Sequence, residues 1–375
     1  MSKDSNYALG GDNGKKQLAD PDLNFRPPWP KSYQAKIGLI GCGGITEYHL
    51  KAYKAKGLEV VALCDLDRSK MEERQKEFFP DAVLYDDYHK ILANGDIGVV
   101  DIALHPEPRY GVVEAALKAG KHVLSQKPFV LDLDKGQALV ELAGEHNLKL
   151  AVNQNGRWAP YVRYTAEAIK AGLIGDIQSV SIRMNWDHTW VKGTAFESIH
   201  HLILYDFAIH WVDMVRLFMG NRKELSAFAQ ITSTRDQEIG VPMVANISFG
   251  FENAIANLMF DGHSKAGAGE DVIVVGSKGT IRCSGEVCKA HKLSLVTDEG
   301  EYSPTLEGEW FHEGFVGTMG ELLCAIEEDR EPENSARQNL ESLKLAFAAI
   351  ASADSGQPVT PGEARRLGES CKPKA

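Results

Sequence analysis

Asp206, His210 and Asp213 could carry out acid–base chemistry together, because the chain spaces them at i, i+4 and i+7. On a helix this spacing puts the three groups on one stripe of an otherwise apolar cylinder. Burying the stripe without partners would be costly, so it either faces a cleft or is satisfied internally. A histidine one turn from a carboxylate suits a general base, since the carboxylate fixes its tautomer and tunes its pKa toward neutrality. The pattern predicts a proton-transfer site around Asp206 and His210.

Two other interpretations of this segment stay open. The histidine and the carboxylate could form a structural pair that satisfies an internal polar site. His200, His201, Asp206 and His210 could also supply metal ligands, but nothing else in the sequence offers a complete coordination set. We therefore expect no metal centre.

Lys127 is the second candidate for chemistry. It ends an apolar, strand-like run and is followed by a proline. In an open parallel sheet, ligands bind at the carboxyl ends of the strands, so Lys127 is expected to point at a ligand crevice. There its ammonium could bind a substrate oxygen and stabilise an alkoxide as a hydride leaves the carbon. A surface lysine at a turn is the alternative, and the strand-end position favours the functional lysine.

A glycine turn directly follows the apolar run 37–40. Gly41, Gly43 and Gly44 separate that run from a helix-like stretch, a geometry that lets backbone N–H groups approach a pyrophosphate. Asp65 ends the next apolar run, where a carboxylate would meet the ribose hydroxyls of a dinucleotide. Glycines near a strand also serve ordinary turns, and Thr46 stands at the third glycine position, where its branched side chain is expected to push the helix off the sheet. Strand, turn, helix and carboxylate together predict dinucleotide binding.

Positioning these side chains requires a parallel sheet, and residues 36–152 have the alternation that builds one. Apolar runs of strand length alternate with amphipathic stretches of helix length, so right-handed crossovers are expected. The fold class is therefore α/β, with an N-terminal Rossmann sheet that is doubly wound. The expected strands are 36–41, 59–64, 82–84, 98–103, 121–125 and 148–152, and the expected helices lie near 44–56, 67–79, 109–119 and 132–146.

The rest of the chain predicts a second, α+β domain. Its strands are joined by short turns with glycine or asparagine, as an antiparallel or mixed sheet requires. We expect an N-terminal arm at 1–35, a nucleotide domain at 36–153, a substrate domain at 154–360 and a tail at 361–375. The arm could be a disordered tail or could lie extended across a partner subunit. The expected helices of the second domain are 158–171, 200–219, 312–329 and 335–353, and its strands are 177–186, 225–233, 243–251, 254–260, 271–275 and 279–283.

Composition narrows the classes of function. The 375 residues suit two domains. A net charge of -11 argues against nucleic acid and anionic membranes as partners. No apolar stretch reaches the roughly 18 residues of a membrane span, and the N-terminus lacks the apolar core of a signal peptide, so we expect a cytoplasmic protein. The six cysteines form no CxxC pair and are expected to be reduced, mostly structural thiols.

Several motifs together resemble the Gfo/Idh/MocA family, named after glucose-fructose oxidoreductase, inositol dehydrogenase and rhizopine catabolism proteins. The likeness runs from about residue 36 to about residue 360. It implies a C-terminal domain whose large open, mostly antiparallel sheet builds homodimers or homotetramers. It also implies NAD or NADP as hydride carrier and a sugar, cyclitol or related polyol as substrate. The motifs are Gly41-x-Gly43-x-x-Thr46-x-x-His49, a strand-end Asp65, Leu104-His105-Pro106, Gly120-Lys121-His122-Val123-Leu124-x-Gln126-Lys127-Pro128, Asn155-x-Arg157-x-x-Pro160, Asp206-x-x-x-His210 and Ser352-Ala353-x-Ser355-Gly356-x-Pro358-Val359.

The resemblance also implies roles for single residues. His210 would take the hydroxyl proton, Lys127 would steady the oxyanion, and Asp206 would orient substrate and histidine, so these three would be catalytic. The cofactor-binding residues predicted from the turn and the resemblance are Gly41, Gly43, Gly44, Ile45, Asp65, Arg68, Leu104, His105, Pro106, Gln126, Lys127 and Asn155. The predicted substrate-binding residues are Lys127, Arg157, Trp158, His188, Asp206 and His210.

This sequence departs from the family pattern where Gln126 replaces the usual glutamate beside Lys127 and where Leu204-Tyr205 replace common glycines, which is expected to narrow the substrate pocket. Asp65 favours NAD, because a carboxylate repels a 2′-phosphate, while Arg68 leaves NADP open.

The predicted function is an NAD(P)-dependent dehydrogenase of a secondary alcohol. Two alternatives remain: an enzyme that cycles a tightly bound cofactor, as in NAD-dependent glycoside hydrolysis or sugar–sugar oxidoreduction, and a dinucleotide-binding regulator without turnover. A regulator has no need for Lys127, Asp206 and His210, so their presence argues against it.

Overall fold

Six parallel strands form the sheet that was predicted from the sequence of the N-terminal half. The structure is a computed structural model that describes residues 16–368 and 371. The strand order is β3-β2-β1-β4-β5-β6, that of a doubly wound Rossmann sheet, and the predicted fold class is confirmed. Ligands of such sheets bind at the carboxyl ends of the strands, and Lys127 lies at that edge. The strands are β1 (Lys36–Ile40), β2 (Glu59–Cys64), β3 (Val83–Tyr85), β4 (Ile97–Ile102), β5 (His122–Ser125) and β6 (Leu150–Val152).

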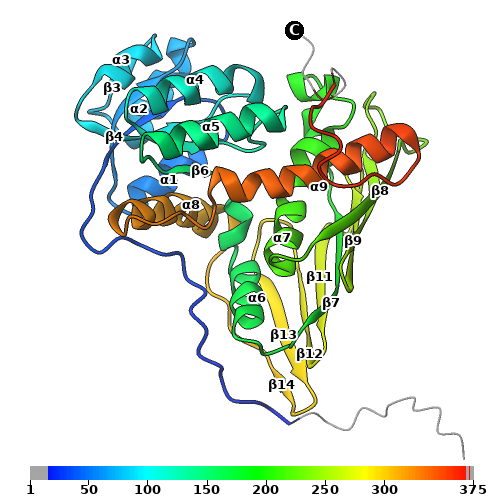
Figure 1. Ribbon diagram of the computed structural model, residues 1–375. Helices are drawn as coiled ribbons and strands as arrows, with labels where there is room; N and C mark the ends of the chain where they lie inside the picture. Colours follow the sequence, from blue (N-terminus) through cyan, green and yellow to red (C-terminus); the bar gives the residue numbers. More distant parts are fainter. Residues whose placement is uncertain (1–15, 369–370, 372–375) are drawn as a thin grey trace, which may run out of the picture.

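Helices cover both faces of this sheet (Figure 1). One face packs on α1, α2 and, from the far end of the chain, α8; the other packs on α3, α4 and α5. The predicted helices are present, and α3 is an addition whose N-cap Asp87 accepts a hydrogen bond from the His89 N–H. These helices are α1 (Thr46–Ala55), α2 (Arg68–Phe78), α3 (Tyr88–Ala93), α4 (Pro106–Lys118) and α5 (Leu133–Glu145).

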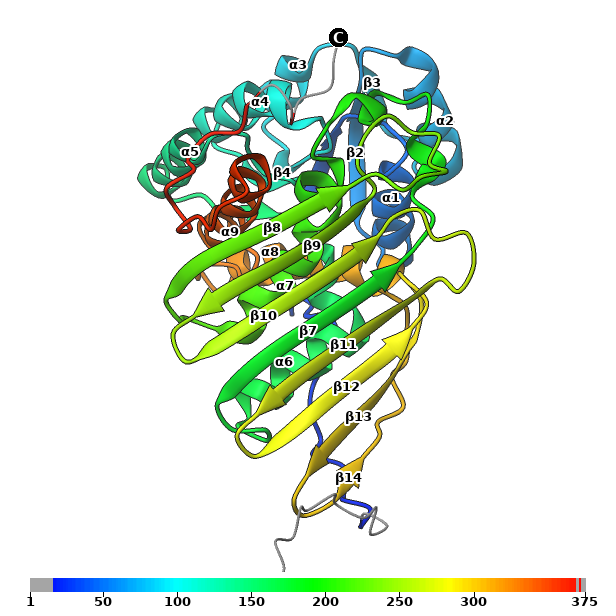
Figure 2. The same ribbon diagram turned by 90° about the vertical axis from the view of Figure 1, so that its right-hand side faces the viewer.

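The second sheet has eight strands in the order β14-β13-β12-β11-β7-β10-β9-β8. All its neighbours are antiparallel except β7 and β10. Helices α6 and α7 lie behind the sheet, and its other face is turned to the viewer in Figure 2. The strands are β7 (Ile177–Asn185), β8 (Glu224–Thr232), β9 (Val244–Phe251), β10 (Ala254–Asp261), β11 (Gly269–Gly276), β12 (Gly279–Gly285), β13 (His291–Thr297) and β14 (Glu301–Tyr302).

The helices of the second half differ from expectation in one respect that matters for the site. The segment predicted as one helix over 200–219 is a π-helix at Ile203–Phe207 followed by α7 (Ile209–Met219). The i→i+5 hydrogen bond from the Ala208 N–H to the Ile203 oxygen, 2.7 Å, marks the π turn. The other helices are α6 (Pro160–Lys170), α8 (Trp310–Glu327) and α9 (Ala336–Ser355), with 3₁₀ turns at Asn155–Trp158, Thr189–Val191 and Ala195–Ser198.

The end of the chain returns to the nucleotide domain. Helix α8 packs on α1 and α9 packs on α5, so both bridge the two halves. After α9, the Leu367 N–H donates to the Leu131 oxygen and the Leu133 N–H donates to the Arg365 oxygen. The C-terminal segment is thereby tied to the loop that follows Lys127.

The described part of the N-terminal arm, residues 16–35, runs extended along its own chain (Figure 1). Leu18 donates to the Glu301 oxygen in β14, and Phe25 meets Tyr164 of α6 edge-on at 5.8 Å between ring centroids. The Glu327 carboxylate, at the end of α8, accepts the backbone N–H groups of residues 31–33. Residues 1–15 lie outside the described part, so the predicted contact with a partner subunit stays a prediction.

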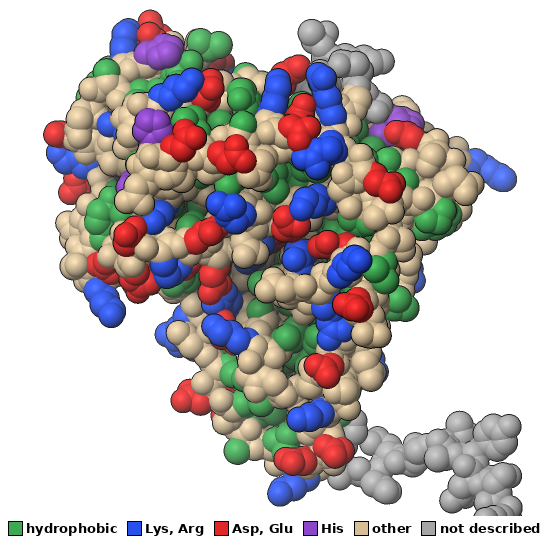
Figure 3. All heavy atoms as spheres, in the orientation of Figure 1, with side chains coloured by type: hydrophobic (Ala, Val, Ile, Leu, Met, Phe, Trp, Pro, Cys, Tyr) green, Lys and Arg blue, Asp and Glu red, His purple; other side chains and the backbone are tan. Residues whose placement is uncertain are grey.

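Several composition-based expectations can be set beside this structure. The described residues contain no disulfide bond and no group of three or more His, Cys, Asp or Glu side chains arranged to hold a metal ion. No described helix is long and apolar enough to cross a membrane. On the face in Figure 3, cationic and anionic side chains are interspersed rather than gathered into a basic surface. The oligomeric state and the cytoplasmic location stay predictions.

Candidate active site

Lys127 and Asp206 come from different domains and meet. Lys127 follows β5 at the carboxyl edge of the Rossmann sheet, and Asp206 belongs to the π-helix before α7. The Lys127 ammonium donates to the Asp206 backbone oxygen at 2.9 Å and lies 3.4 Å from Oδ1 of the same residue. The two side chains are 17% and 21% exposed, so a ligand can reach them. An ammonium has three donors, and one remains for a substrate oxygen.

His210 lies one turn further along, at the start of α7. Its ring is edge-on to Trp310, with 5.3 Å between centroids, and its buried Nδ1 has no hydrogen-bond partner among the described residues. Burial, and then the Lys127 charge, hold the pKa of His210 well below its usual range. The predicted tuning of the histidine by a carboxylate is not met, since no described carboxylate hydrogen-bonds it. The imidazole is neutral near pH 7 and can accept a proton.

His188 adds an N–H donor to this group. It lies on the loop after β7, where the Trp190 indole donates to its Nδ1 at 3.2 Å. The proton of the neutral ring is therefore on Nε2, which is buried and has no partner in the part of the chain that the structure describes. Burial lowers the pKa of His188 to about 4, with Asp206 opposing and Lys127 adding to the shift. Asp206 and Lys127 both contribute to this shift, so His188 lies near them.

Aromatic rings wall the site on the side of the substrate domain. Trp186, Trp190 and Phe207 have their ring centroids 5.4, 5.0 and 4.3 Å from that of His188. Phe196 links this wall to the nucleotide domain, because its ring lies 5.5 Å from that of His105. The cluster therefore combines charged groups with apolar ring faces, as sites for small molecules commonly do.

The glycine turn has the shape that a pyrophosphate needs. Gly41 has φ +92°, and a Cβ there would lie 2.7 Å from the Ala103 oxygen, so only glycine fits. At Gly43 and Gly44 a Cβ would meet nothing within 4 Å, which leaves open space above the turn. Helix α1 begins directly after Ile45, and the Thr46 hydroxyl donates back to the Gly43 oxygen at 2.6 Å. A phosphate above the turn would face the N-terminus of α1.

Asp65 lies at the end of β2 beside this turn. Its Oδ2 accepts the Cys42 N–H at 2.7 Å and its Oδ1 accepts the Asp67 N–H at 2.9 Å. These bonds fix the carboxylate, and its remaining lone pairs can accept ribose hydroxyls. The Arg68 guanidinium binds Glu72 instead, with Nε 2.8 Å from Oε1. Asp65 is therefore placed to accept hydroxyl groups, while the Arg68 guanidinium is paired with Glu72.

The segment predicted to flank the nicotinamide lies where α4 begins. Leu104 is half-buried beside Gly41, His105 is exposed, and Pro106 opens the helix. The buried Arg109 holds this segment, because its Nε donates to the Leu104 oxygen at 2.9 Å while its Nη1 donates to the Gln126 and Pro128 oxygens. One guanidinium thus ties the loop after β4 to the loop that carries Lys127.

Gln126 and Asn155, both predicted to bind cofactor, point elsewhere in the described structure. Gln126 is 8% exposed, and its side chain contacts His49 in the interior. Asn155 is buried, and its Oδ1 accepts the Trp310 indole N–H at 3.1 Å. Both positions hold the walls of the site rather than its open surface.

Arg157 and Trp158 do not face the substrate as expected. The Arg157 guanidinium makes a two-pronged ion pair with Asp213, at 2.7 and 2.8 Å, and both side chains are almost fully buried. Trp158 is fully buried against Gly317 of α8. A buried cation needs a paired anion, and Asp213 fills that role here. The stripe predicted for Asp206, His210 and Asp213 is therefore split.

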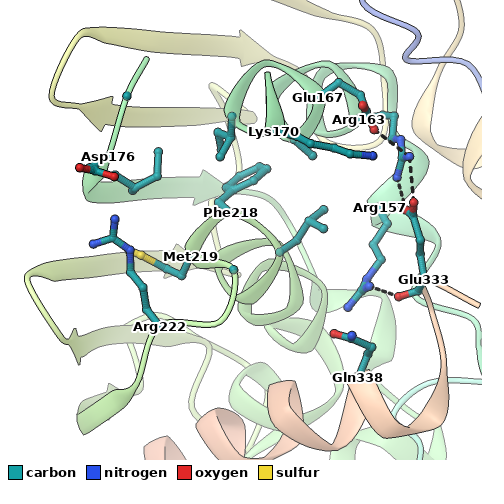
Figure 4. A pocket seen from close by; sticks show the side chains of 16 residues that line it. Arg157, Arg163, Glu167, Lys170, Asp176, Phe218, Met219, Arg222, Glu333 and Gln338 are labelled. Carbon is teal, nitrogen blue, oxygen red and sulfur yellow. Dashed lines mark hydrogen bonds and ion pairs between the residues drawn. The ribbon is translucent and has the colours of Figure 1, made fainter. Parts of the chain in front are cut away.

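Figure 4 shows the pocket that Arg157 lines. It borders a cavity of about 490 Å³ between the ends of α6 and α7, together with Arg163 and Glu333, whose side chains are ion-paired. Lys127, Asp206 and His210 do not line this cavity. The pocket is therefore separate from the candidate active site.

Comparison with known proteins agrees with this architecture. Residues 35–154 match the oxidoreductase family with an NAD-binding Rossmann fold, and residues 162–282 match the GFO/IDH/MocA C-terminal domain. The chain belongs to the Gfo/Idh/MocA family. The resemblance drawn from the motifs is confirmed, and the chain is an NAD-binding oxidoreductase.

Members of the Gfo/Idh/MocA family with named activities cover most of the chain. D-apiose dehydrogenase of Paraburkholderia graminis is 28% identical over 86% of this chain and 89% of its own length. Inositol 2-dehydrogenase of Rhizobium meliloti is 25% identical over 84% and 96%. The structure of scyllo-inositol dehydrogenase from Lactobacillus casei with NAD(H) and scyllo-inositol has a TM-score of 0.75, with 22% identity over 88% and 100%.

Sequence reasoning missed residues that support this family site from behind. Arg109 lay at the start of a predicted helix, and a single arginine there gives no sign that it is buried. Leu66 is 95% exposed next to Asp65, and a leucine directly after the carboxylate predicted to bind ribose was a signal that sequence reasoning did not use. His49, part of the glycine motif, is fully buried and bonds Asp101 at 2.7 Å.

Proposed function

We propose that the protein interconverts a secondary alcohol of a sugar, cyclitol or related polyol and the corresponding ketone, with NAD as the hydride carrier. The observation that carries the proposal is the contact between Lys127 and Asp206, which joins the cofactor edge of one domain to the substrate wall of the other. His210, neutral and one turn away, supplies the base.

NAD fits the open glycine turn, where Gly41–Gly44 and the start of α1 would hold the pyrophosphate and Asp65 the ribose. When bound there, NAD supplies the acceptor for the hydride. Leu66 would cover the adenine, because burying an exposed leucine side chain is favourable. Full burial is worth about 1.5–3 kcal/mol, and contact with one face of a ring is worth less.

The chain's own residues handle the proton and the charge. The third donor of the Lys127 ammonium binds the reacting oxygen and stabilises its negative charge as the C–H bond breaks. His210 accepts the hydroxyl proton, which it can do because its ring is neutral. Asp206 holds the ammonium in place from the opposite domain, so the lysine stays oriented while the oxygen changes its charge.

A ring-shaped polyol suits the remaining surface. The His188 Nε2–H donor, fixed by Trp190, would bind a second hydroxyl. The aromatic wall offers flat apolar faces to the C–H side of a ring. The relatives named as D-apiose and inositol dehydrogenases support this substrate class.

The test is a panel of sugars, cyclitols and their acids, offered with NAD and with NADP, and followed by absorbance of the reduced nicotinamide. We expect turnover of at least one ring polyol with NAD. Lys127→Ala should still bind NADH but lose about 100-fold or more in kcat. Lys118→Ala, a substitution of an exposed lysine of α4, is the control. Unchanged turnover in Lys127→Ala would refute the role of the lysine.

Dialysis of the purified protein separates the other functions. A cofactor that stays bound through dialysis, with no net change in absorbance on any polyol, would favour redox cycling within one turnover. Binding of NADH without any turnover would favour a regulator.

A further inference from the structure

A chain of buried polar side chains lies directly behind Lys127. His49 and Asp101 are fully buried, with the His49 Nδ1 2.7 Å from Asp101 Oδ2, which also accepts the Tyr53 hydroxyl at 2.7 Å. On its other side, the His49 Nε2 lies 3.1 Å from Gln126 Nε2 and 3.0 Å from Asn153 Nδ2. Burying so many polar groups costs free energy unless each group has a partner. This row of side chains must therefore contribute to stability or to function.

The direction of these hydrogen bonds follows from one backbone group. The Lys127 N–H, which can only donate, lies 2.7 Å from Gln126 Oε1. The oxygen of the Gln126 amide is therefore on that side, and its NH₂ group faces His49. The His49 Nε2 must then accept, which places the ring proton on Nδ1, where it is donated to Asp101.

We propose that Gln126 is a positioning residue: through its amide and a neutral His49, the buried Asp101 carboxylate fixes the backbone of Lys127. This inference rests on the proposed function, in which the Lys127 ammonium must meet the reacting oxygen. The side chain of Gln126 holds the Lys127 N–H, and Arg109 holds the carbonyl oxygens of residues 126 and 128. The main chain at the strand end is thus held on both sides.

Only a side chain with both a donor and an acceptor can make both of the Gln126 contacts while His49 is neutral. A carboxylate at this position keeps the acceptor for the Lys127 N–H but presents a second acceptor to the His49 Nε2. That contact becomes favourable only if His49 takes up a second proton, which two flanking carboxylates would stabilise. An apolar side chain loses both contacts.

Three variants separate positioning from simple stability. Gln126→Met removes both hydrogen bonds at similar volume. Gln126→Glu keeps the bond to Lys127 and changes the proton count of His49. Asn153→Ala removes a hydrogen bond of the same kind to the same His49 nitrogen but leaves the Gln126–Lys127 contact, and it is the matched control. Thermal unfolding of each variant shows that it is folded.

Two measurements do not need a substrate. NMR of protein with ¹⁵N-labelled histidine, with His49→Gln to assign the signal among the twelve histidines, should show Nε2 unprotonated in the wild type and both nitrogens protonated in Gln126→Glu. Exchange of the Lys127 amide proton should accelerate about tenfold or more in Gln126→Met, and remain slow in Gln126→Glu and Asn153→Ala. A protonated Nε2 in the wild type, or slow exchange in Gln126→Met, would overturn the proposal.

The third measurement uses turnover of the polyol found in the panel. We expect kcat to fall about tenfold or more in Gln126→Met with KM within about threefold, because a small displacement of the lysine misaligns the reacting groups. Gln126→Glu should restore kcat to within about threefold of the wild type. Folded Gln126→Met with wild-type kcat, or an equal loss in Asn153→Ala, would contradict the positioning role. If no polyol is turned over by the wild type, the proposed function fails while the NMR and exchange results still decide the hydrogen-bond chain.

Discussion

Replacing His188 by asparagine is expected to make the fold less sensitive to acid. His188 is 3% exposed and no carboxylate of the described residues is bonded to it, and burial lowers its pKa to about 4. In the unfolded chain the same imidazole has a pKa of about 6.5. As the pH falls below about 6.5, the imidazole becomes protonated in the unfolded state but stays neutral in the folded state. The protein therefore loses stability between about pH 6.5 and about pH 4.

The size of this loss follows from the two pKa values. At about pH 5 the imidazole is mostly protonated in the unfolded state and hardly protonated in the folded state. Proton uptake then shifts the folding equilibrium roughly 30-fold toward the unfolded state, which lowers the free energy of unfolding by about 2 kcal/mol. At about pH 7 the same difference is only about 0.2 kcal/mol. Asparagine does not titrate. In His188→Asn the free energy of unfolding should therefore drop by about 2 kcal/mol less between these two pH values, whatever the substitution costs at neutral pH.

Urea unfolding followed by tryptophan fluorescence measures both quantities, since the chain has six tryptophans. His89→Asn, which replaces an exposed imidazole that water solvates in both states, is the matched control. An acid-induced loss of stability as large in His188→Asn as in the wild type would show that His188 is protonated in the fold, and the assignment of its Nε2–H as a donor from a neutral ring would fail with it.

Three further outcomes are expected. Arg157→Met leaves Asp213 buried without its cation and should lower the free energy of unfolding by about 3–5 kcal/mol in urea titrations. KM for the polyol should stay near that of the wild type. A raised KM at unchanged stability would show instead that Arg157 belongs to the substrate site. Gly41→Ala should weaken NADH binding, measured by fluorescence titration, because its φ of +92° and a backbone oxygen 2.7 Å from the new Cβ force the turn to move; equal affinity would mean that the turn does not hold the cofactor. Glu327→Ala should speed amide exchange at residues 31–33, whose N–H groups it accepts, and unchanged exchange would show that the arm is held elsewhere.

The nucleotide domain could be predicted from the sequence nearly strand for strand, because each of its elements carries its own signal. The buried strands are continuous apolar runs, and the helices between them are long enough to show their periodicity. Helix α3 escaped because its six residues are too few for a periodic pattern. In the second domain, β13 (His291–Thr297) and the two-residue β14 were also missed. The missed elements lie away from Lys127, so the location of the site did not depend on them.

The candidate site could be predicted as a set of residue types but not as a set of directions. Lys127 was placed by its position at a strand end, which the topology of a parallel sheet dictates. Arg157 and Gln126 belong to motifs of the same apparent quality, yet both turn inward, because Asp213 and His49 offer them partners that lie 56 and 77 residues away in the chain. Only the packed structure decides whether a polar side chain bonds a partner in the interior or stays available to bond a ligand.

The π-helix explains how two carboxylates seven residues apart come to serve different partners. A regular helix through residue 203 would align Asp206 with Asp213 on one stripe. The i→i+5 turn at Ile203–Phe207 accommodates an extra residue, so the residues before Ala208 are rotated relative to those of α7. Asp206 reaches across to Lys127 in the other domain, and Asp213 turns to Arg157 within its own. Such a turn leaves no mark in residue spacing. It nevertheless separates the two carboxylates, so that Asp206 lies beside Lys127 and Asp213 is paired with Arg157 inside the fold.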